Sequence, residues 1–279
     1  MKISYKLIIA AAALSALFGC GTLSGSAQNK PAHRKIALQC YTFREFTLEE
    51  TLEKVKDLGF DALEGTPAQK ISASRPVKIA PGMSAEDKAA LKALLAKYNL
   101  KFASYGVVQA KTEADVVKYC KFAKEFGIGA ILTEAPVSTF KYWEKHGRAF
   151  GVKMYLHNHA DTSQNQYFDP EVVRHFVSRC EFVKANPDNG HWSRSGIDSV
   201  EGFKILKGQI GSIHLKDQRK FGEPENNPVP YGEGGLRLKE VLAELDRQGY
   251  DGYFVIEYET DWSNPLPAVK KCVEFLRNN

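Results

Sequence analysis

Short apolar runs alternate with longer amphipathic segments along most of the chain, from Lys35 onward. Eight of these runs are rich in β-branched or aromatic residues, as strands are; they occupy residues 36–41, 62–65, 101–107, 130–134, 152–159, 182–186, 212–215 and 253–257. Each of the first seven leads into a segment of helical pattern, and an eighth such segment closes the chain. The pattern predicts eight consecutive strand–helix units.

Helix-start and helix-stop residues punctuate this alternation. The sequence Thr47-Leu48-Glu49-Glu50 has the form of a capping box, Ser84 opens a similar segment, and Asp169-Pro170 places a cap before a first-turn proline. Glycines stand just before four predicted strands, at positions 59, 127, 151 and 249. Repetition of helix, glycine and strand predicts βα units wound into a parallel sheet.

Eight βα units in about 245 residues predict an α/β fold: a (β/α)8 TIM barrel, formed as a single domain by residues 35–279. A doubly wound open sheet is the alternative. No Gly-x-Gly-x-x-Gly motif follows a predicted strand, so the sequence offers no support for a dinucleotide site.

Composition narrows the function classes. Of 279 residues, 43% are hydrophobic and 25% charged, which excludes disordered, collagen-like and coiled-coil chains. The net charge of +5 is spread without a long basic run, so we expect no nucleic-acid partner. Cys40, Cys120, Cys180 and Cys272 match no zinc or redox spacing. We expect free thiols, the last three in helices, and the sequence does not require a disulfide.

The first 34 residues differ from the rest. Two lysines precede an apolar run at 7–18, which is too short to span a bilayer comfortably, and small and polar residues follow. This is the pattern of a secretory signal, and the Leu-Phe-Gly-Cys sequence ending at Cys20 resembles a bacterial lipobox. We expect a signal peptide at 1–19, a lipidated Cys20 and a polar tether at 20–34; cleavage after Ala27 is the alternative. Both predict export, to the periplasm or as an outer-membrane lipoprotein, with membrane contact only through a lipid anchor.

Ionisable residues fall near the carboxyl ends of most predicted strands. In a barrel these ends converge on one mouth, where active sites lie. The residues concerned are Glu64, Glu134, His157, His159, Asp188, His191, His214, Lys216 and Glu257. The mouth is therefore the predicted location of the functional site.

The chemistry of these residues favours a metal. His157 and His159 share a face of their predicted strand, because alternate residues of a strand point the same way. Imidazoles beside carboxylates from other strands suit Mn²⁺, Zn²⁺, Fe²⁺ or Co²⁺ and suit Ca²⁺ poorly. Lys216 shares a face with His214 and has two open roles: it stabilises an oxyanion, or it pairs with Glu257 or Asp217.

Five short motifs, taken together, resemble a known family. In chain order they are Leu156-His157-Asn158-His159, Asp188-x-x-His191, Ile213-His214-Leu215-Lys216-Asp217, Val229-Pro230-Tyr231-Gly232-Glu233-Gly234 and Val255-Ile256-Glu257. Over about residues 35–279 the chain resembles the xylose-isomerase-like TIM barrel family, also called the sugar phosphate isomerase/epimerase group.

The resemblance implies a divalent metal held by the fifth to eighth strands. Carried over, the ligands fall on His157, Asp188, His214 and Glu257, with His191 near the metal or the substrate. Many members have Glu where this chain has His157. Related epimerases use two glutamates on opposite faces of the sugar, so this departure argues against symmetric two-base epimerisation.

Three functions remain open. The family's shared chemistry is proton abstraction beside a carbonyl. Because an exported enzyme meets few sugar phosphates, the preferred hypothesis is a metal-dependent lyase that cleaves 3-keto-glycosides by β-elimination, as related 3-keto-glycoside lyases and C-glycoside deglycosidases do. A sugar or hydroxy-keto-acid isomerase or epimerase is the second hypothesis. A non-catalytic sugar-binding lipoprotein is the third.

The lyase hypothesis assigns a role to each candidate catalytic residue. The base is Glu134, Glu257 or His159, with no order among them. Lys216 helps to hold the charge on the keto oxygen, and His191 is the acid that assists the leaving group. The expected partner is a small sugar or keto-glycoside substrate.

Overall fold

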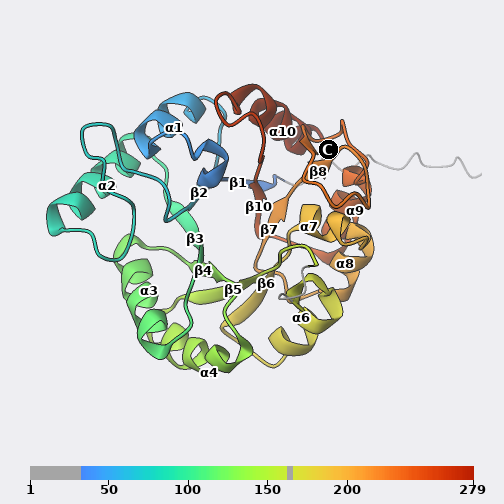
Figure 1. The fold of residues 1–279 in the computed structure, drawn as a ribbon, viewed down its shortest axis with the longest axis horizontal. Coiled ribbons are helices and arrows are strands. Elements are labelled where there is room, and N and C mark those ends of the chain that lie inside the picture. Colours follow the sequence, from blue (N-terminus) through green and yellow to red (C-terminus); the bar gives the residue numbers. More distant parts are fainter. Residues whose placement is uncertain (1–32, 162–165) are drawn as a thin grey trace, which may run out of the picture. The chain divides into compact units, whose positions relative to one another are not determined.

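The computed structural model describes residues 33–161 and 166–279. Eight parallel strands follow one another in the order β6-β5-β4-β3-β2-β1-β10-β7 (Figure 1). Their bounds are β1 Lys35–Gln39, β2 Ala62–Gly65, β3 Phe102–Val108, β4 Ala130–Thr133, β5 Lys153–His157, β6 Val183–Asn186, β7 Ser212–Leu215 and β10 Tyr253–Ile256. Bridges from Ala185 to Ile210 and from Asp188 to His214 join the two outer strands. The predicted barrel is confirmed, and the open sheet is excluded.

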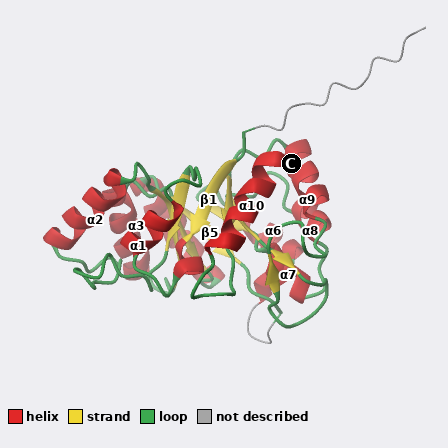
Figure 2. Cartoon of the chain, turned by 90° about the horizontal axis from the view of Figure 1, so that it is seen from above, coloured by secondary structure: helices red, strands yellow, loops and turns green. Residues whose placement is uncertain are grey.

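Helices surround the strands (Figure 1), and the turned view shows helices on both sides of them (Figure 2). They are α1 Leu48–Val55, α2 Ala85–Lys97, α3 Glu113–Phe126, α4 Phe140–Tyr142, α5 Arg148–Phe150, α6 Pro170–Val177, α7 Asn189–Arg194, α8 Ser199–Ile205, α9 Leu238–Gln248 and α10 Leu266–Asn278. A short antiparallel pair, β8 Asp217–Gln218 and β9 Pro228–Val229, follows β7. Each strand is thus covered on its outer side by the segment that leads to the next.

Most predicted helix boundaries are confirmed. Thr47 and Glu50 form the capping box of α1, with Thr47 N–H donating to the Glu50 carboxylate over 2.8 Å. Ser84 and Asp169 cap α2 and α6. Gly59 is the exception: α1 ends at Val55, and Gly59 follows a separate turn.

Strand residues alternate between the inside of the barrel and the layer beneath the helices. Ala37, Ala62 and Val255 pack together in a small hydrophobic cluster. Their neighbours along the strands, such as Ile36 and Leu63, belong instead to the main core. Successive strand residues point to opposite faces. Gln39, Glu64 and Glu257, each two positions beyond a member of this small cluster, therefore point toward the barrel axis at the carboxyl end.

The four cysteines of the described residues form no disulfide, and no helix there could span a membrane. Cys40, Cys120, Cys180 and Cys272 are free thiols, and all but Cys180 are buried. Cys180 follows the end of α6, which corrects its predicted helical position. Within 33–161 and 166–279, every helix is too short or too polar to cross a membrane. The predicted signal peptide, lipidated Cys20 and nearly all of the tether lie outside the described residues.

Candidate metal centre and active site

Side chains from three adjacent strand ends meet at the barrel mouth. His157 ends β5, Asp188 lies two residues beyond β6, and His214 lies in β7. One nitrogen or oxygen atom from each of these residues lies within 4.8 Å of the others, and all three residues are buried. Glu257, just after β10, adds an oxygen 3.0 Å from His214 Nδ1. The four expected metal ligands are therefore brought together.

His157 is held in a form suited to binding a cation. Its Nδ1 atom lies 2.8 Å from Asn186 Oδ1, and the Asn186 amide donates in turn to Ser212 Oγ over 2.8 Å. Burial and the neighbouring His214 ring lower the pKa of His157 to about 4. The ring is therefore neutral at neutral pH, as a metal-binding imidazole must be.

Asp188 is positioned by the backbone around it. It is the N-cap of α7, and its Oδ1 accepts the His191 N–H over 3.0 Å. Asn158 bridges the strand end, accepting the Asp188 N–H over 2.9 Å and donating to the Asp188 carbonyl over 3.2 Å. These bonds leave Oδ2 directed at Lys216 Nζ, 2.8 Å away. The Asp-x-x-His motif thus works as a helix cap that aims one carboxylate oxygen into the mouth.

Lys216 is a buried positive charge among the carboxylates of the site. Only 1% of the residue is exposed, and its Nζ atom lies 2.8, 2.9 and 2.6 Å from carboxylate oxygens of Asp188, Glu257 and Glu259. Burial favours its neutral form, but these carboxylates outweigh burial and hold its pKa well above the usual range. The ammonium group donates a hydrogen bond to Glu259 and forms ion pairs with Asp188 and Glu257. Of the two roles expected for Lys216, the geometry favours ion pairing over oxyanion binding. Glu257, one of the two expected partners, is in contact with Lys216, whereas Asp217, the other, is not among the carboxylates that pair with it.

Asp217 has a separate structural task. Its Oδ2 accepts the N–H groups of Gly232 and Gly234 over 2.9 and 3.1 Å, and its Oδ1 accepts that of Leu236 over 3.2 Å. A Cβ on Gly234 would lie 2.3 Å from Asp217 Oδ1. The carboxylate therefore holds the loop that leads to α9, and it does not join the mouth cluster.

Glu134 and His159 form a pair at the rim. Glu134 follows β4, and β5 ends at His157, so His159 lies in a loop and not in the strand predicted to reach it. The His159 Nδ1 and Glu134 Oε1 atoms are in direct contact. Burial lowers the pKa of His159, but the bond to Glu134 outweighs it and raises the pKa overall. The pair therefore favours an imidazolium beside a carboxylate.

His191 stands next to this pair. Its ring centroid is 4.6 Å from that of His159, and its Nε2 atom is 3.8 Å from Asp188 Oδ2. Burial lowers the pKa of His191 well below the usual range. Its Nδ1 atom accepts from the Arg194 guanidinium over 3.3 Å, so the proton of the neutral ring is on Nε2, where His191 can act as a donor.

These groups surround a cavity of about 300 Å³. It is lined by the side chains of Tyr41, His157, His159, His191, Glu257 and Glu259, with Gln39, Thr66, Pro67, Ala68, Gly106 and Val107. A polar wall with several ionisable groups in a concave site is what small-molecule chemistry requires. The mouth is therefore the candidate active site.

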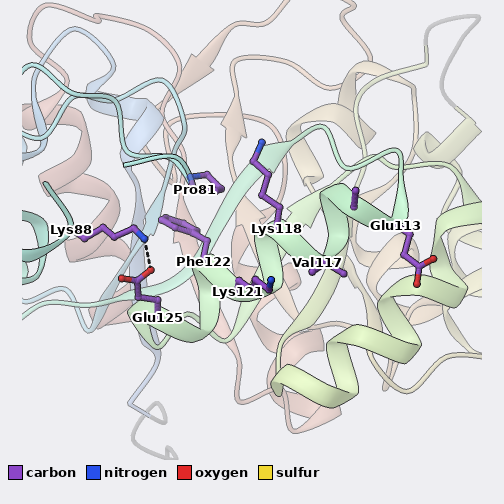
Figure 3. A pocket seen from close by; sticks show the side chains of 9 residues that line it. Pro81, Lys88, Glu113, Val117, Lys118, Lys121, Phe122 and Glu125 are labelled. Atoms are coloured by element: carbon purple, nitrogen blue, oxygen red, sulfur yellow. Dashed lines mark ion pairs between the residues drawn. The ribbon is translucent and has the colours of Figure 1, made fainter. Parts of the chain in front are cut away.

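A second hollow, of about 640 Å³, lies on the outer surface along α3 (Figure 3). Its carboxylates are in ion pairs with lysines: Glu125 lies 2.8 Å from Lys88, and Glu113 lies 2.9 Å from Lys145. None of the predicted site residues lines it. This groove is therefore separate from the candidate active site.

Several site residues were not predicted from sequence. Glu64 was noted at a strand end but received no role, although it contacts His214. Glu259 is not among the residues predicted from the sequence. It lies two residues beyond Glu257, and because alternate residues of an extended segment share a face, this spacing could have predicted that it reaches the mouth as well. Gln39 and Ser104, which both bond Glu64, carry no signal of their own.

Comparison with known proteins shows the family and the fold of the chain. The family profile described as "Xylose isomerase-like TIM barrel" matches residues 52–279. An inosose dehydratase from Mesomycoplasma hyopneumoniae strain J is 26% identical in an alignment 242 residues long. The match covers 69% of this chain and 80% of that protein. A crystal structure of an uncharacterized protein from Parabacteroides distasonis has a TM-score of 0.71 at 26% identity, covering 88% of this chain and 99% of the other. The 3-keto-D-glucoside 4-epimerase of E. coli has a TM-score of 0.67 at 17% identity, covering 88% and 100% of the two chains, and is alike in fold.

Proposed function

Since this chain belongs to the xylose isomerase-like TIM barrel family and is a sugar-processing enzyme of that family, we propose that it is a metal-dependent lyase acting on 3-keto-glycosides. The reaction is a β-elimination. A proton leaves C2, next to the C3 carbonyl, and the C1–oxygen bond then breaks. The products are the free aglycone and an unsaturated keto-sugar. We also propose that the protein is exported, on the strength of the leader sequence.

The observation that carries this proposal is the convergence of two imidazoles and two carboxylates at the mouth. His157, Asp188, His214 and Glu257 present nitrogen and oxygen donors, the mixture that suits Mn²⁺, Zn²⁺, Fe²⁺ or Co²⁺. The residues present therefore fit a divalent ion. When bound, such an ion draws electron density from a carbonyl oxygen and makes the neighbouring C–H more acidic.

The groups able to move a proton lie together on one side of the cavity. Glu134, His159 and His191 follow β4, β5 and β6, and the two imidazoles are 4.6 Å apart. Elimination needs only one acceptor and one donor, and both can act on the same substrate face, whereas two-base epimerisation needs groups on opposite faces. This arrangement supports elimination.

The contacts divide the two roles. His191 is kept neutral by burial, and its Nδ1 atom accepts from the Arg194 guanidinium over 3.3 Å, so its Nε2–H is the donor that assists the departing glycosidic oxygen. Burial raises the pKa of Glu134, but the contact with His159 outweighs burial and lowers it overall, so Glu134 is ionised and is the proton acceptor for C2. Glu257 is engaged by Lys216 and His214 and acts as a ligand, not as the base.

The relatives' names support an elimination. A dehydratase removes water, and the curated relative is named for this activity on an inosose. Loss of an alcohol in place of water follows the same chemistry. The similar fold of a 3-keto-D-glucoside epimerase supports a keto-sugar ligand.

The test is incubation of the Mn²⁺-loaded protein with a 3-keto-glycoside and, separately, with the unoxidised glycoside, followed by mass spectrometry. We expect aglycone and unsaturated keto-sugar from the first and no reaction with the second. Deuterium at C2 should slow the reaction if proton removal limits the rate. Recovery of a C2 or C4 epimer with its glycosidic bond intact would contradict the lyase and favour an epimerase.

A further inference from the structure

The Glu64 carboxylate is completely enclosed at the floor of the mouth. It is 0% exposed, and it accepts three hydrogen bonds. The Gln39 amide donates to Oε1 over 2.5 Å, and the Ser104 hydroxyl donates to Oε2 over 2.6 Å. His214 Nε2 lies 2.5 Å from Oε1. Strand register places Gln39, Glu64 and Ser104 side by side on β1, β2 and β3, so the first two donors come from its immediate neighbours.

The direction of these bonds is determined by the groups around them. Gln39 Oε1 accepts the Tyr41 N–H over 3.1 Å, so the amide nitrogen of Gln39 must face Glu64. A serine hydroxyl can donate to the second carboxylate oxygen. Glu64 is thereby supplied with donors on both oxygens and acts only as an acceptor. The proton in its contact with His214 therefore lies on the histidine Nε2.

The other nitrogen of His214 faces the opposite way, toward the mouth. Its Nδ1 atom is 3.0 Å from Glu257 Oε2 and 3.8 Å from Asp188 Oδ2. With Nε2 donating to Glu64, Nδ1 is the atom that can share a cation with these two carboxylates. A carboxylate that accepts from the remote nitrogen orients a metal-binding histidine and selects its tautomer.

We propose that Glu64 is the positioning residue of this site: by holding His214 as the Nε2–H tautomer, it directs Nδ1 toward Asp188 and Glu257 as a ligand atom for a divalent cation. This inference rests on the proposed metal-dependent function. Glu64 is not among the residues that line the cavity. Its effect is on cation affinity, exerted through His214.

The first experiment measures Zn²⁺ binding to the purified protein by calorimetry. Glu64→Gln replaces the charged acceptor of His214 by a neutral amide, so the bond that fixes the ring is weaker, and we expect affinity to fall by about 10–100-fold. Glu244→Gln is the matched control, because it removes an equal charge from a buried carboxylate outside the mouth; Glu244 bonds Arg247 and Gln248. We expect Zn²⁺ affinity close to that of the wild type there, since the orientation of His214 is unchanged.

The second measurement reports on the tautomer directly and uses the wild-type protein. In ¹⁵N-histidine NMR spectra of the Zn²⁺-loaded protein, His214 should show a strongly hydrogen-bonded proton on Nε2 and none on Nδ1. Assignment comes from the loss of this signal in His214→Gln. The same proton should shift or exchange rapidly with water in Glu64→Gln.

The outcomes separate the two proposals. A wild-type protein that binds no Zn²⁺ would overturn the metal-dependent function. A wild type that binds Zn²⁺ while Glu64→Gln binds as well as Glu244→Gln would overturn only the role of Glu64. If Glu64→Gln does not fold, Glu64→Asp keeps the charge but withdraws it from His214, and the same loss of affinity is expected. A proton on Nδ1 in the wild-type spectrum contradicts the proposal without any variant.

Discussion

At the scale of single residues, the buried ammonium group of Lys216 contacts three carboxylates at the mouth. Its ammonium group serves Asp188, Glu257 and Glu259 at once, and each of these carboxylates lies within 3 Å of it. Removal of one partner from a buried ion pair leaves the other charge without compensation and costs about 3–5 kcal/mol. Lys216 is therefore a structural as well as an electrostatic centre of the site.

Lys216→Met should lower the free energy of unfolding by about 3–5 kcal/mol, since three carboxylates lose their shared cation. Mn²⁺ should restore part of the loss, because a divalent ion supplies positive charge beside Asp188 and Glu257 and binds only the folded state. Thermal unfolding with and without Mn²⁺ is the measurement. Lys204→Met, which breaks an exposed pair with Glu201, is the control and should change little. An unchanged melting temperature for Lys216→Met would contradict the importance of its ion pairs.

His191→Gln should separate the two halves of the proposed reaction. With the donor lost, aglycone release should fall by about 10²–10⁴-fold. Proton removal by Glu134 should continue, so substrate recovered from D₂O should carry deuterium at C2. Mass spectrometry measures both. His175→Gln, an exposed histidine on α6, should behave as wild type. Simultaneous loss of exchange and release would identify His191 as the base instead of the acid.

At the scale of elements, α7 joins the strand-end cluster to the helical layer. This six-residue helix begins beside Asp188 and carries His191 toward the cavity, while Trp192 packs its ring 5.1 Å from that of Phe203 on α8. Gly190 faces Lys216: a Cβ there would lie 2.7 Å from Lys216 Cδ and 3.0 Å from its Cβ. The close approach of α7 to β7 therefore requires glycine.

Gly190→Ala should destabilise the protein by about 1–3 kcal/mol, because the added methyl group overlaps a side chain that is fully buried and has no room to move. The shift of Lys216 should also weaken Zn²⁺ binding, which calorimetry would detect. Gly82→Ala is the control, since its Cβ would meet nothing within 4 Å. Denaturant unfolding of both variants checks the stability difference, and equal stabilities would show that α7 can retreat without cost.

At the scale of the whole molecule, the barrel of residues 33–279 is a compact unit by itself. From the leader sequence we predict that the mature protein begins at a lipidated Cys20 and fractionates with membranes. One lipid chain holds a protein to a membrane only marginally, whereas two or three hold it firmly. Cys20→Ser should therefore move the protein to the soluble fraction, as measured by immunoblotting of separated fractions. Retention of the variant on membranes would contradict the lipobox interpretation.

Much of the architecture could be predicted because its signals are local. The capping box at Thr47 and the cap at Asp169 lie within one helical turn of the groups they bond. The short runs of β-branched and aromatic residues identified every strand of the barrel, with small errors at the strand ends. The predicted fifth strand, for example, extends to His159, whereas β5 ends at His157. The apolar pattern gives no sign that the strand ends there.

The sequence by itself determined the barrel and the set of residues that reach its mouth, because strand period and helix caps depend on near neighbours. Only the tertiary structure decided which of these residues meet. Glu64 and His214 are 150 positions apart, and their contact depends on the tilt and register of a closed sheet. The partners of Lys216 come from three different segments, and no spacing in the chain encodes their distances. Contacts between residues distant in sequence arise from closure of the barrel, and the roles of Glu64, Glu259 and Lys216 follow from those contacts.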